Sequence, residues 1–324
     1  MMHRWIAAAA VCGLLLAGCG SEDDAPPSAT PAATPPSGSA SIYAPTSDVS
    51  SNAAIGKDVA AIRALLEPET AGARPDFDAA KQIWSHGKFS GKSDGTKRTL
   101  AAFVEKHPAG RHVTDALAGT GTAATLSAEQ RLEWIDKGMV VALKVHALEE
   151  FEGAKEKLAA GELDPKEGAA HNVDEVWAYF TADGEGVVAT AAKRANDFGI
   201  DEQELGDDVI AGISAAQDAV ASKDTAALEA ATQRTRGAMN RIFALAVKKY
   251  AVEGAKDETA RLEGLAFSWG LVGELSDRDL KSIQNALASD MSPAAAKAVA
   301  DALDRAASKL GFDGPLASYP RTSP

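Results

Sequence analysis

From about Asp48 to the C-terminus, the sequence has the pattern of α-helices almost throughout. Alanine, the residue with the highest helix propensity, is abundant, and the alternation of β-branched and polar residues that is typical of strands is missing. Helices of this kind bury their apolar stripes against one another. The sequence therefore predicts an all-α domain over residues 48–324, a helical bundle of roughly ten helices.

Several residues mark expected helix boundaries. Ser127 and Gln130 form a capping box, which predicts a long helix running to about Ala160. Pro165 is expected to start the next helix, because proline is favoured in the first turn. Ser292, followed by a proline, predicts the start of the last helix.

The first twenty residues have the features of an export signal that ends at a lipid-attachment site. Arg4 precedes an apolar stretch too short to span a membrane, and Leu16-Ala17-Gly18-Cys19 matches a bacterial lipobox. We expect a signal peptide over residues 1–18 and a periplasmic or cell-surface lipoprotein anchored through lipid on Cys19. Gly20 gives no acidic retention signal, which favours the outer membrane. The alternative is an ordinary secretory signal followed by an unrelated cysteine.

Residues 19–47 are expected to be a linker, because their Pro, Ser, Thr and Ala composition cannot form a core. Such a segment is extended and would hold the folded part away from the membrane. The chain has two cysteines, Cys12 in the expected signal and Cys19. The mature domain would then have no free thiol, which excludes disulfides, thiolate metal ligands and cysteine nucleophiles.

The net charge of −13 excludes some classes of binding partner. An acidic chain repels phosphates and anionic lipid, so we expect neither nucleic-acid binding nor a polybasic membrane anchor. Acidity suits the capture of cations, although many solvated surfaces are simply acidic. Hydrolase chemistry finds little support, since the sequence has no Gly-x-Ser-x-Gly elbow and no strand to hold one.

A faint internal repeat suggests a duplicated arrangement. Residues 141–155 resemble residues 242–256, and after each comes a helix in which an acid precedes aromatic residues, at 171–180 and at 261–269. Two helical hairpins related by duplication would pack with pseudo-two-fold symmetry. Alanine-rich helices also resemble one another by composition alone, so both interpretations stay open.

The longest expected helix carries an imidazole and carboxylates on one face. Met139, Leu143, His146 and Glu150 follow one another at i, i+4, i+7 and i+11, with Glu149 beside them. His-x-x-Glu and His-x-x-x-Glu spacings place the side chains together, as carboxylate–histidine metal sites in helical bundles require. The alternative is a boundary histidine with solvated acids.

Two further groups complete the candidate ligands. His171, Asp174 and Glu175 lie together on the next expected helix, opposite its apolar side, where a plain solvated face is the alternative. Glu263 precedes ten residues without a charge, residues 264–273. A buried carboxylate there must be coordinated, protonated or paired with an arginine.

Nitrogen and oxygen ligands suit iron, manganese or zinc better than copper(I). A di-iron oxygenase would need paired Glu-x-x-His motifs, whereas the order here is His-x-x-Glu in one clear copy, so redox catalysis is not expected. The predicted metal ligands are His146, Glu149, Glu150, His171, Asp174, Glu175 and Glu263.

Four runs of residues, spread over about residues 75–275, carry a family resemblance. The first run begins with Ile83-Trp-Ser-His-Gly-Lys-Phe-Ser90 and continues to Phe103. The other three are Arg131-Leu-Glu-Trp-Ile-Asp-Lys-Gly138, His171-Asn-Val-Asp-Glu-Val-Trp-Ala-Tyr-Phe180 and Lys193-Arg-Ala-Asn-Asp-Phe198. These runs resemble segments of the algal low-iron-inducible, iron-assimilating periplasmic proteins and their bacterial relatives. The resemblance implies extracytoplasmic iron binding that feeds uptake, with ligands among the matched segments.

A weaker resemblance is to imelysin-like iron-regulated lipoproteins, which are also duplicated helical bundles. Their Gly-x-His-x-x-Glu element is not matched, because Lys144 and Val145 precede His146. Both resemblances imply iron as the metal.

The sequence as a whole predicts a membrane-anchored periplasmic protein that binds iron for assimilation and is not an enzyme. Its expected partners are the metal ion, with manganese or zinc as alternatives, the membrane, and an iron permease or reductase. A structural or adaptor envelope lipoprotein without metal is the main alternative, and a helical metalloenzyme is a third.

Overall fold

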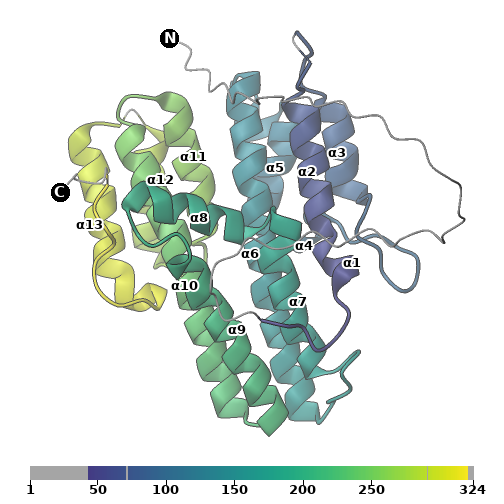
Figure 1. Ribbon diagram of the computed structural model, residues 1–324. Helices are drawn as coiled ribbons and strands as arrows, with labels where there is room; N and C mark the ends of the chain where they lie inside the picture. The colour runs from purple at the N-terminus through teal and green to yellow at the C-terminus, as the bar shows by residue number, and fades with distance from the viewer. Residues whose placement is uncertain (1–42, 71, 290, 320–324) are drawn as a thin grey trace, which may run out of the picture. The chain divides into compact units, whose positions relative to one another are not determined.

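The computed structural model describes residues 43–70, 72–289 and 291–319, and helices account for most of them (Figure 1). In these residues no strand is present, and the one β-bridge joins Gly91 to Lys97. The all-α prediction is thereby confirmed. The α-helices are α1 (Ser50–Ala53), α2 (Ile55–Leu66), α3 (Phe77–His86), α4 (Leu100–Phe103), α5 (Pro108–Ala118), α6 (Ala128–Ala160), α7 (Ala169–Thr181), α8 (Val187–Phe198), α9 (Glu204–Ser222), α10 (Thr225–Glu253), α11 (Glu258–Trp269), α12 (Asp277–Ala288) and α13 (Pro293–Leu310).

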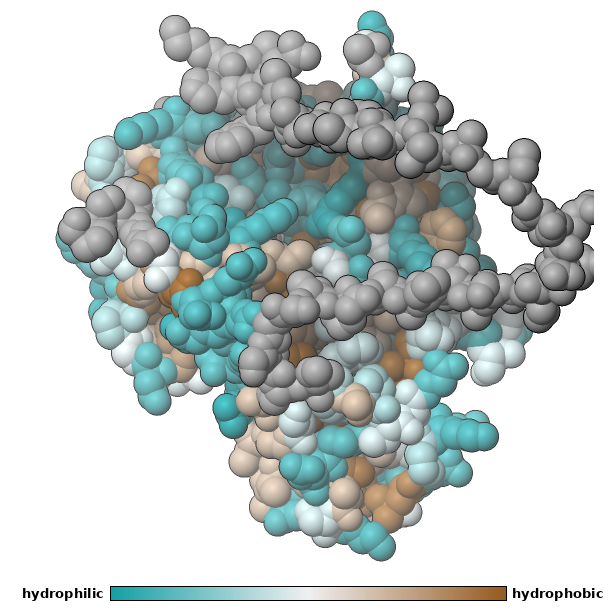
Figure 2. Space-filling view, viewed as in Figure 1, coloured by the Kyte–Doolittle hydropathy of each residue, from teal (hydrophilic) through white to brown (hydrophobic). Residues whose placement is uncertain are grey.

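The predicted signal peptide, the lipid-attachment residue Cys19 and most of the predicted linker lie outside the described residues. No helix in the described part of the chain is long and apolar enough to cross a membrane. Figure 2 shows hydrophilic side chains over much of one face, with apolar residues scattered among them. Phe89, 42% exposed, stands out as an exposed large apolar side chain.

Helix α6 is the central element of the bundle, because it packs against α5, α7, α10 and α11. Its apolar residues face several neighbours, and Leu143 and Phe151 are completely buried. Burial of each such side chain contributes about 1.5–3 kcal/mol to folding. The predicted capping box is present, since Ser127 accepts from the backbone of Gln130 and the Gln130 side chain accepts from the backbone of Ser127.

The prediction that Pro165 starts a helix is wrong. Helix α7 begins at Ala169, after Gly168 as its N-cap. Pro165 lies in the connecting turn, where the backbone N–H groups of Gly168 and Ala169 donate to the carbonyls of Asp164 and Glu162. These turn hydrogen bonds take the place of a first helical turn at the proline.

The second half of the bundle is organised around α10. Helix α10 packs against α9, α11 and α13, and α12 packs against both α11 and α13. The two helix pairs expected from the repeat, α6 with α7 and α10 with α11, each lie side by side (Figure 1). A symmetry relation between these pairs stays a prediction.

Residues 43–49, here called the N-terminal strap, pack onto the bundle. They run from beside α9 across α7 before the chain enters α1 (Figure 1), and Tyr43 is only 8% exposed. The composition of residues 43–47 predicts that they belong to the linker. The structure makes them part of the folded unit, because their polar groups satisfy a buried carboxylate of α7.

Candidate metal centre

Helices α6 and α7 each present one His-x-x-x-Glu pair at their shared interface. A short loop joins the two helices, which pack side by side and therefore run antiparallel (Figure 1). In α6, His146 Nε2 lies 3.3 Å from Glu150 Oε1, and in α7, His171 Nε2 lies 3.5 Å from Glu175 Oε1. Both pairs are one helical turn apart in sequence, which puts each imidazole beside its carboxylate.

The two carboxyl groups of this cluster meet in a largely buried position. Burial, followed by the negative charge of Glu175, raises the pKa of Glu150 to about 8. Burial alone would raise the pKa of Glu175 as well, but hydrogen bonds from His171 and Glu150 outweigh it and lower that pKa. At neutral pH Glu150 therefore holds a proton and donates it to the ionised Glu175.

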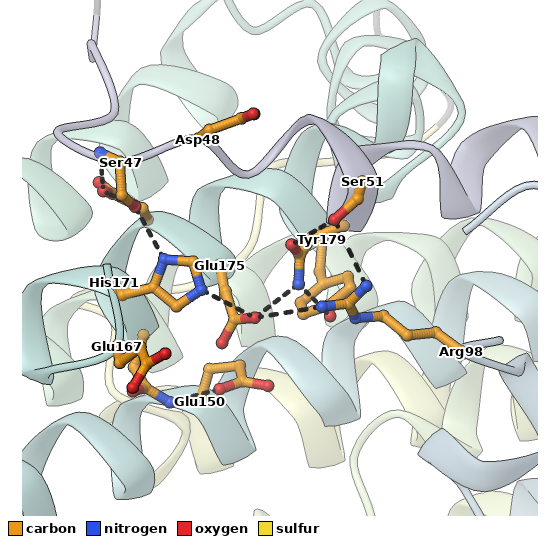
Figure 3. A network of polar contacts seen from close by, with 12 residues as sticks. Ser47, Asp48, Ser51, Arg98, Glu150, Glu167, His171, Glu175 and Tyr179 are labelled. Carbon is orange, nitrogen blue, oxygen red and sulfur yellow. Dashed lines mark hydrogen bonds and ion pairs between the residues drawn. The ribbon is translucent and has the colours of Figure 1, made fainter. Parts of the chain in front are cut away.

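Amide and guanidinium groups complete the surroundings of the carboxyl pair. Asn172 Nδ2 donates to Glu150 Oε2 at 2.6 Å, and Asn52 Nδ2 donates to Glu175 Oε1 at 2.6 Å. Figure 3 shows Glu175 between His171 and Arg98, with the Arg98 Nη2 atom 3.8 Å from the Glu175 carboxylate. The Arg98 guanidinium compensates the negative charge of Glu175, and the proton on Glu150 removes the charge of the second carboxyl group.

Aromatic rings form the wall around His146. The ring of Phe103 stacks on the imidazole with centroids 3.7 Å apart, and Tyr179 lies 4.7 Å away. The Tyr179 hydroxyl accepts a hydrogen bond from Asn52. Glu149 faces His146 Nδ1 at 3.1 Å, but its side chain is 62% exposed, which places it at the rim of the cluster.

Four polar members of this site were not predicted from the sequence. Amides and single arginines have no helical pattern that separates them from ordinary surface residues. Three of the four lie in the runs that carry the family resemblance, which is the one signal that could have drawn attention to them. The four residues are Asn52, Arg98, Asn172 and Tyr179.

Asp174 lies one helical face away from the carboxyl pair and has other partners. Its side chain is completely buried and accepts five hydrogen bonds, four from the N-terminal strap and one from Gln217 of α9. These donors occupy both carboxylate oxygens. The structure therefore places Asp174 in contact with the strap and α9, and not with Glu150.

Glu263 is not brought to the cluster either. Its carboxylate pairs with Lys137 of α6 at 3.1 Å, and Lys137 also contacts Glu133 at 2.7 Å and Asp136 at 2.9 Å. Lys137 is nine residues before His146, which corresponds to about 13 Å along the helix axis. Of the three alternatives that the sequence left open for Glu263, the structure contains the ion pair, with a lysine in place of the expected arginine.

Four of the seven predicted ligands thus lie in one cluster: His146, Glu150, His171 and Glu175. Across residues 43–70, 72–289 and 291–319, no three or more His, Cys, Asp or Glu side chains already converge as a group that could hold a metal ion. The imidazole–carboxylate distances of 3.3 and 3.5 Å are nevertheless close to the separation of two ligands on one ion, about 3.0–3.5 Å for metal–ligand bonds of about 2.1 Å. The donor set, imidazole nitrogen and carboxylate oxygen, fits iron, manganese or zinc.

Comparison with known families identifies the family of this chain. A family model described as low iron-inducible periplasmic protein matches residues 25–252, well over half of the chain. The matched region contains all four cluster residues and ends within α10, before Glu263. Neither the curated proteins nor the solved structures contain a significant match to this chain. The extent of the family match shows that the chain belongs to the low iron-inducible periplasmic proteins.

Proposed function

We propose that this protein binds iron in the periplasm through His146, Glu150, His171 and Glu175, as a carrier and not as an enzyme. The observation that carries the proposal is the buried Glu150–Glu175 carboxyl pair, flanked on both sides by an imidazole. Iron is the substrate here, the cargo to be concentrated and handed on. Membership in a family named for induction at low iron supports the choice of metal.

The chemistry of the pair favours a cation over the proton that it holds. A buried carboxyl with its pKa raised to about 8 is protonated because two negative charges in one low-dielectric place repel each other. A divalent or trivalent ion neutralises both carboxylates at once, so it displaces that proton on binding. The four side chains would rotate to converge on one ion when it binds, as side chains at many binding sites do.

A lipid anchor on Cys19 is the second part of the proposal. The lipobox Leu16-Ala17-Gly18-Cys19 supports it. An anchored carrier would stay beside an iron permease or reductase, to which it delivers the metal. Mass spectrometry of the mature N-terminus tests the anchor: we expect acyl groups on Cys19, and release of a Cys19→Ala variant from the membrane fraction.

Metal uptake is tested by calorimetry and elemental analysis on the mature protein with Fe(II), Fe(III), Mn(II) and Zn(II). We expect micromolar or tighter binding, and a loss of at least tenfold in affinity for Glu150→Gln or Glu175→Gln. Glu263→Gln is the matched control, because it removes an equally buried carboxylate outside the cluster, and its affinity should equal that of the wild type. If none of the four ions binds, the carrier function is wrong and a structural envelope lipoprotein is what remains.

A further inference from the structure

The connection between α3 and α4 is a small hairpin, residues 87–98, here called the basic hairpin. A β-bridge joins its two arms. At its base, the buried carboxylate of Asp58 accepts hydrogen bonds from the backbone N–H groups of Lys88 and Phe89, both at 3.0 Å. The hairpin is therefore held in place before any partner arrives, so its docking costs little ordering entropy.

The exposed side of the basic hairpin combines positive charge with an apolar ring. Lys88, Lys92 and Lys97 are exposed, and so is Phe89. Lys88 Nζ lies 4.9 Å from the centre of the Phe89 ring. Asp94 is the one acidic residue of this segment. Lysines around an exposed aromatic ring match a surface of anionic lipid, which attracts the cations and takes up the ring at headgroup level.

The acidic net charge of the whole chain does not exclude such a contact. Charges are screened over a Debye length of about 8 Å at physiological ionic strength. Lipid headgroups therefore interact mainly with the protein charges closest to them. The expectation that the chain has no polybasic anchor follows from the total charge of −13, which says nothing of one hairpin.

The basic hairpin also lies beside the end of the folded unit that a lipid anchor would hold. Ser90 Oγ donates to the carbonyl oxygen of Ser51 in α1 at 2.7 Å, and α1 directly follows the N-terminal strap (Figure 1). We propose that the basic hairpin docks on the anionic lipid surface to which Cys19 tethers the chain, with Phe89 among the headgroups. This inference rests on the proposed lipid anchor and not on metal binding.

Docking of the hairpin would orient the metal cluster, which a lipid on Cys19 alone does not do. Arg98 ends the hairpin, and its Nη2 atom lies 3.8 Å from the Glu175 carboxylate. The hairpin and the cluster are thus in direct contact. A carrier docked in this way would hold its cargo close to the membrane surface.

The test couples the mature chain, starting at Cys19, to vesicles that contain a maleimide lipid. Cys19 is the only cysteine after residue 18, so the coupling is specific and does not depend on lipidation in the cell. Phe89→Trp reports the contact, because brominated lipid chains quench the fluorescence of a tryptophan that reaches them. The unsubstituted chain gives the background from its own tryptophans. We expect quenching on vesicles with phosphatidylglycerol and little on phosphatidylcholine alone.

The lysines are tested in the Phe89→Trp chain. Each lysine near an anionic surface contributes about a fivefold factor, so Lys92→Gln should lower the ratio of docked to undocked chains about fivefold. Lys92→Glu with Lys97→Glu should abolish the quenching. The matched control is Lys281→Glu with Lys309→Glu, which changes the net charge equally at exposed positions of α12 and α13 and should dock like the parent chain.

Two results would overturn the inference. Equal losses in the two double variants would mean that only the total charge matters. An unquenched tryptophan on phosphatidylglycerol vesicles would exclude the lipid surface and favour an acidic protein as the partner of the hairpin. Docking by a chain that has no affinity for any metal would instead support the hairpin contact and refute the carrier function.

Discussion

At the scale of single residues, the protonation of the Glu150–Glu175 pair depends most strongly on its surroundings. Burial and the neighbouring carboxylate raise the pKa of Glu150 to about 8, although ordinary glutamates are ionised at neutral pH. The charged or titratable groups near this pair include His146, His171, Arg98, Lys157, Tyr179 and the rim residue Glu149. Two measurements follow from this one proton.

The first measurement is the pH dependence of metal affinity. Below pH 8 a metal ion must displace the Glu150 proton, so the apparent affinity should rise by about tenfold from pH 7 to pH 9, most of it below pH 8, and level off above that. Calorimetry in buffers of different ionisation enthalpy should show release of about one proton at pH 7. In Glu150→Gln this proton release should vanish. Equal affinities at pH 7 and pH 9 in the wild type would contradict the assignment.

The second measurement is the stability of the metal-free protein. The folded state keeps the Glu150 proton up to about pH 8, whereas the unfolded state releases it near the ordinary glutamate pKa. The folded state therefore binds more protons between these values, and the free energy of unfolding falls as the pH rises through that window. Urea denaturation at pH 6 and pH 9 should show this loss, and Glu150→Gln should reduce it. A saturating metal ion should restore stability at pH 9.

At the scale of helices, the charged residues around Lys137 tie α6 to its neighbours. Lys137 pairs with Glu263 of α11, and the adjacent Asp136 pairs with Arg63 of α2 at 2.6 Å. Burial opposes the charge on Lys137, but three carboxylates outweigh it and raise the pKa well above the ordinary value. These contacts hold α2, α6 and α11 in register without taking part in the metal cluster.

Replacing Lys137 by methionine tests this structural role. The variant leaves the part-buried Glu133 and Glu263 without a cation, whereas Asp136 keeps Arg63, and we expect a loss of about 3–5 kcal/mol of unfolding free energy. Denaturant unfolding measures the loss, and Lys281→Met, at an exposed position on α12, is the control and should be neutral. Metal affinity per folded molecule should stay unchanged. A variant as stable as the wild type would show that the ion pairs contribute nothing net.

At the scale of the whole molecule, the strap is part of the folded domain and sets its N-terminal boundary. The sequence places the domain start at residue 48, but four of the five hydrogen bonds to the buried Asp174 come from residues 43–47. A chain that starts at residue 48 leaves this carboxylate with Gln217 alone. The cost of such a buried, poorly paired charge is about 3 kcal/mol or more.

Truncation tests this boundary. We expect a chain starting at residue 43 to unfold at the same denaturant concentration as the mature protein, and one starting at residue 48 to unfold at a lower concentration. The longer chain should also bind iron more tightly, because it keeps Ser47 beside His171. If both chains match the mature protein in stability and affinity, the strap has no role in either.

Several features of this fold could be read from particular residues. The start of α6 at Ser127 and the side-by-side placement of His146 with Glu150 both follow from local rules of the helix, which act over one or two turns. Pro165 failed as a helix start because turn hydrogen bonds in residues 162–169 competed with it. The expected duplication does not predict a second copy of the metal cluster, because the positions that align with His146 and Glu150 are Val247 and Ala251.

The sequence by itself determined the helical class, the long central helix, the two imidazole–carboxylate pairs and the family resemblance, because each depends on residues close together in the chain. Only the tertiary structure decided which pairs meet. In the folded protein Glu150 lies beside Glu175, Glu263 forms an ion pair with Lys137, and the strap forms hydrogen bonds with Asp174 and His171. These contacts span up to about 130 positions in the chain, and their choice depends on how whole helices pack and on which buried charges can find partners.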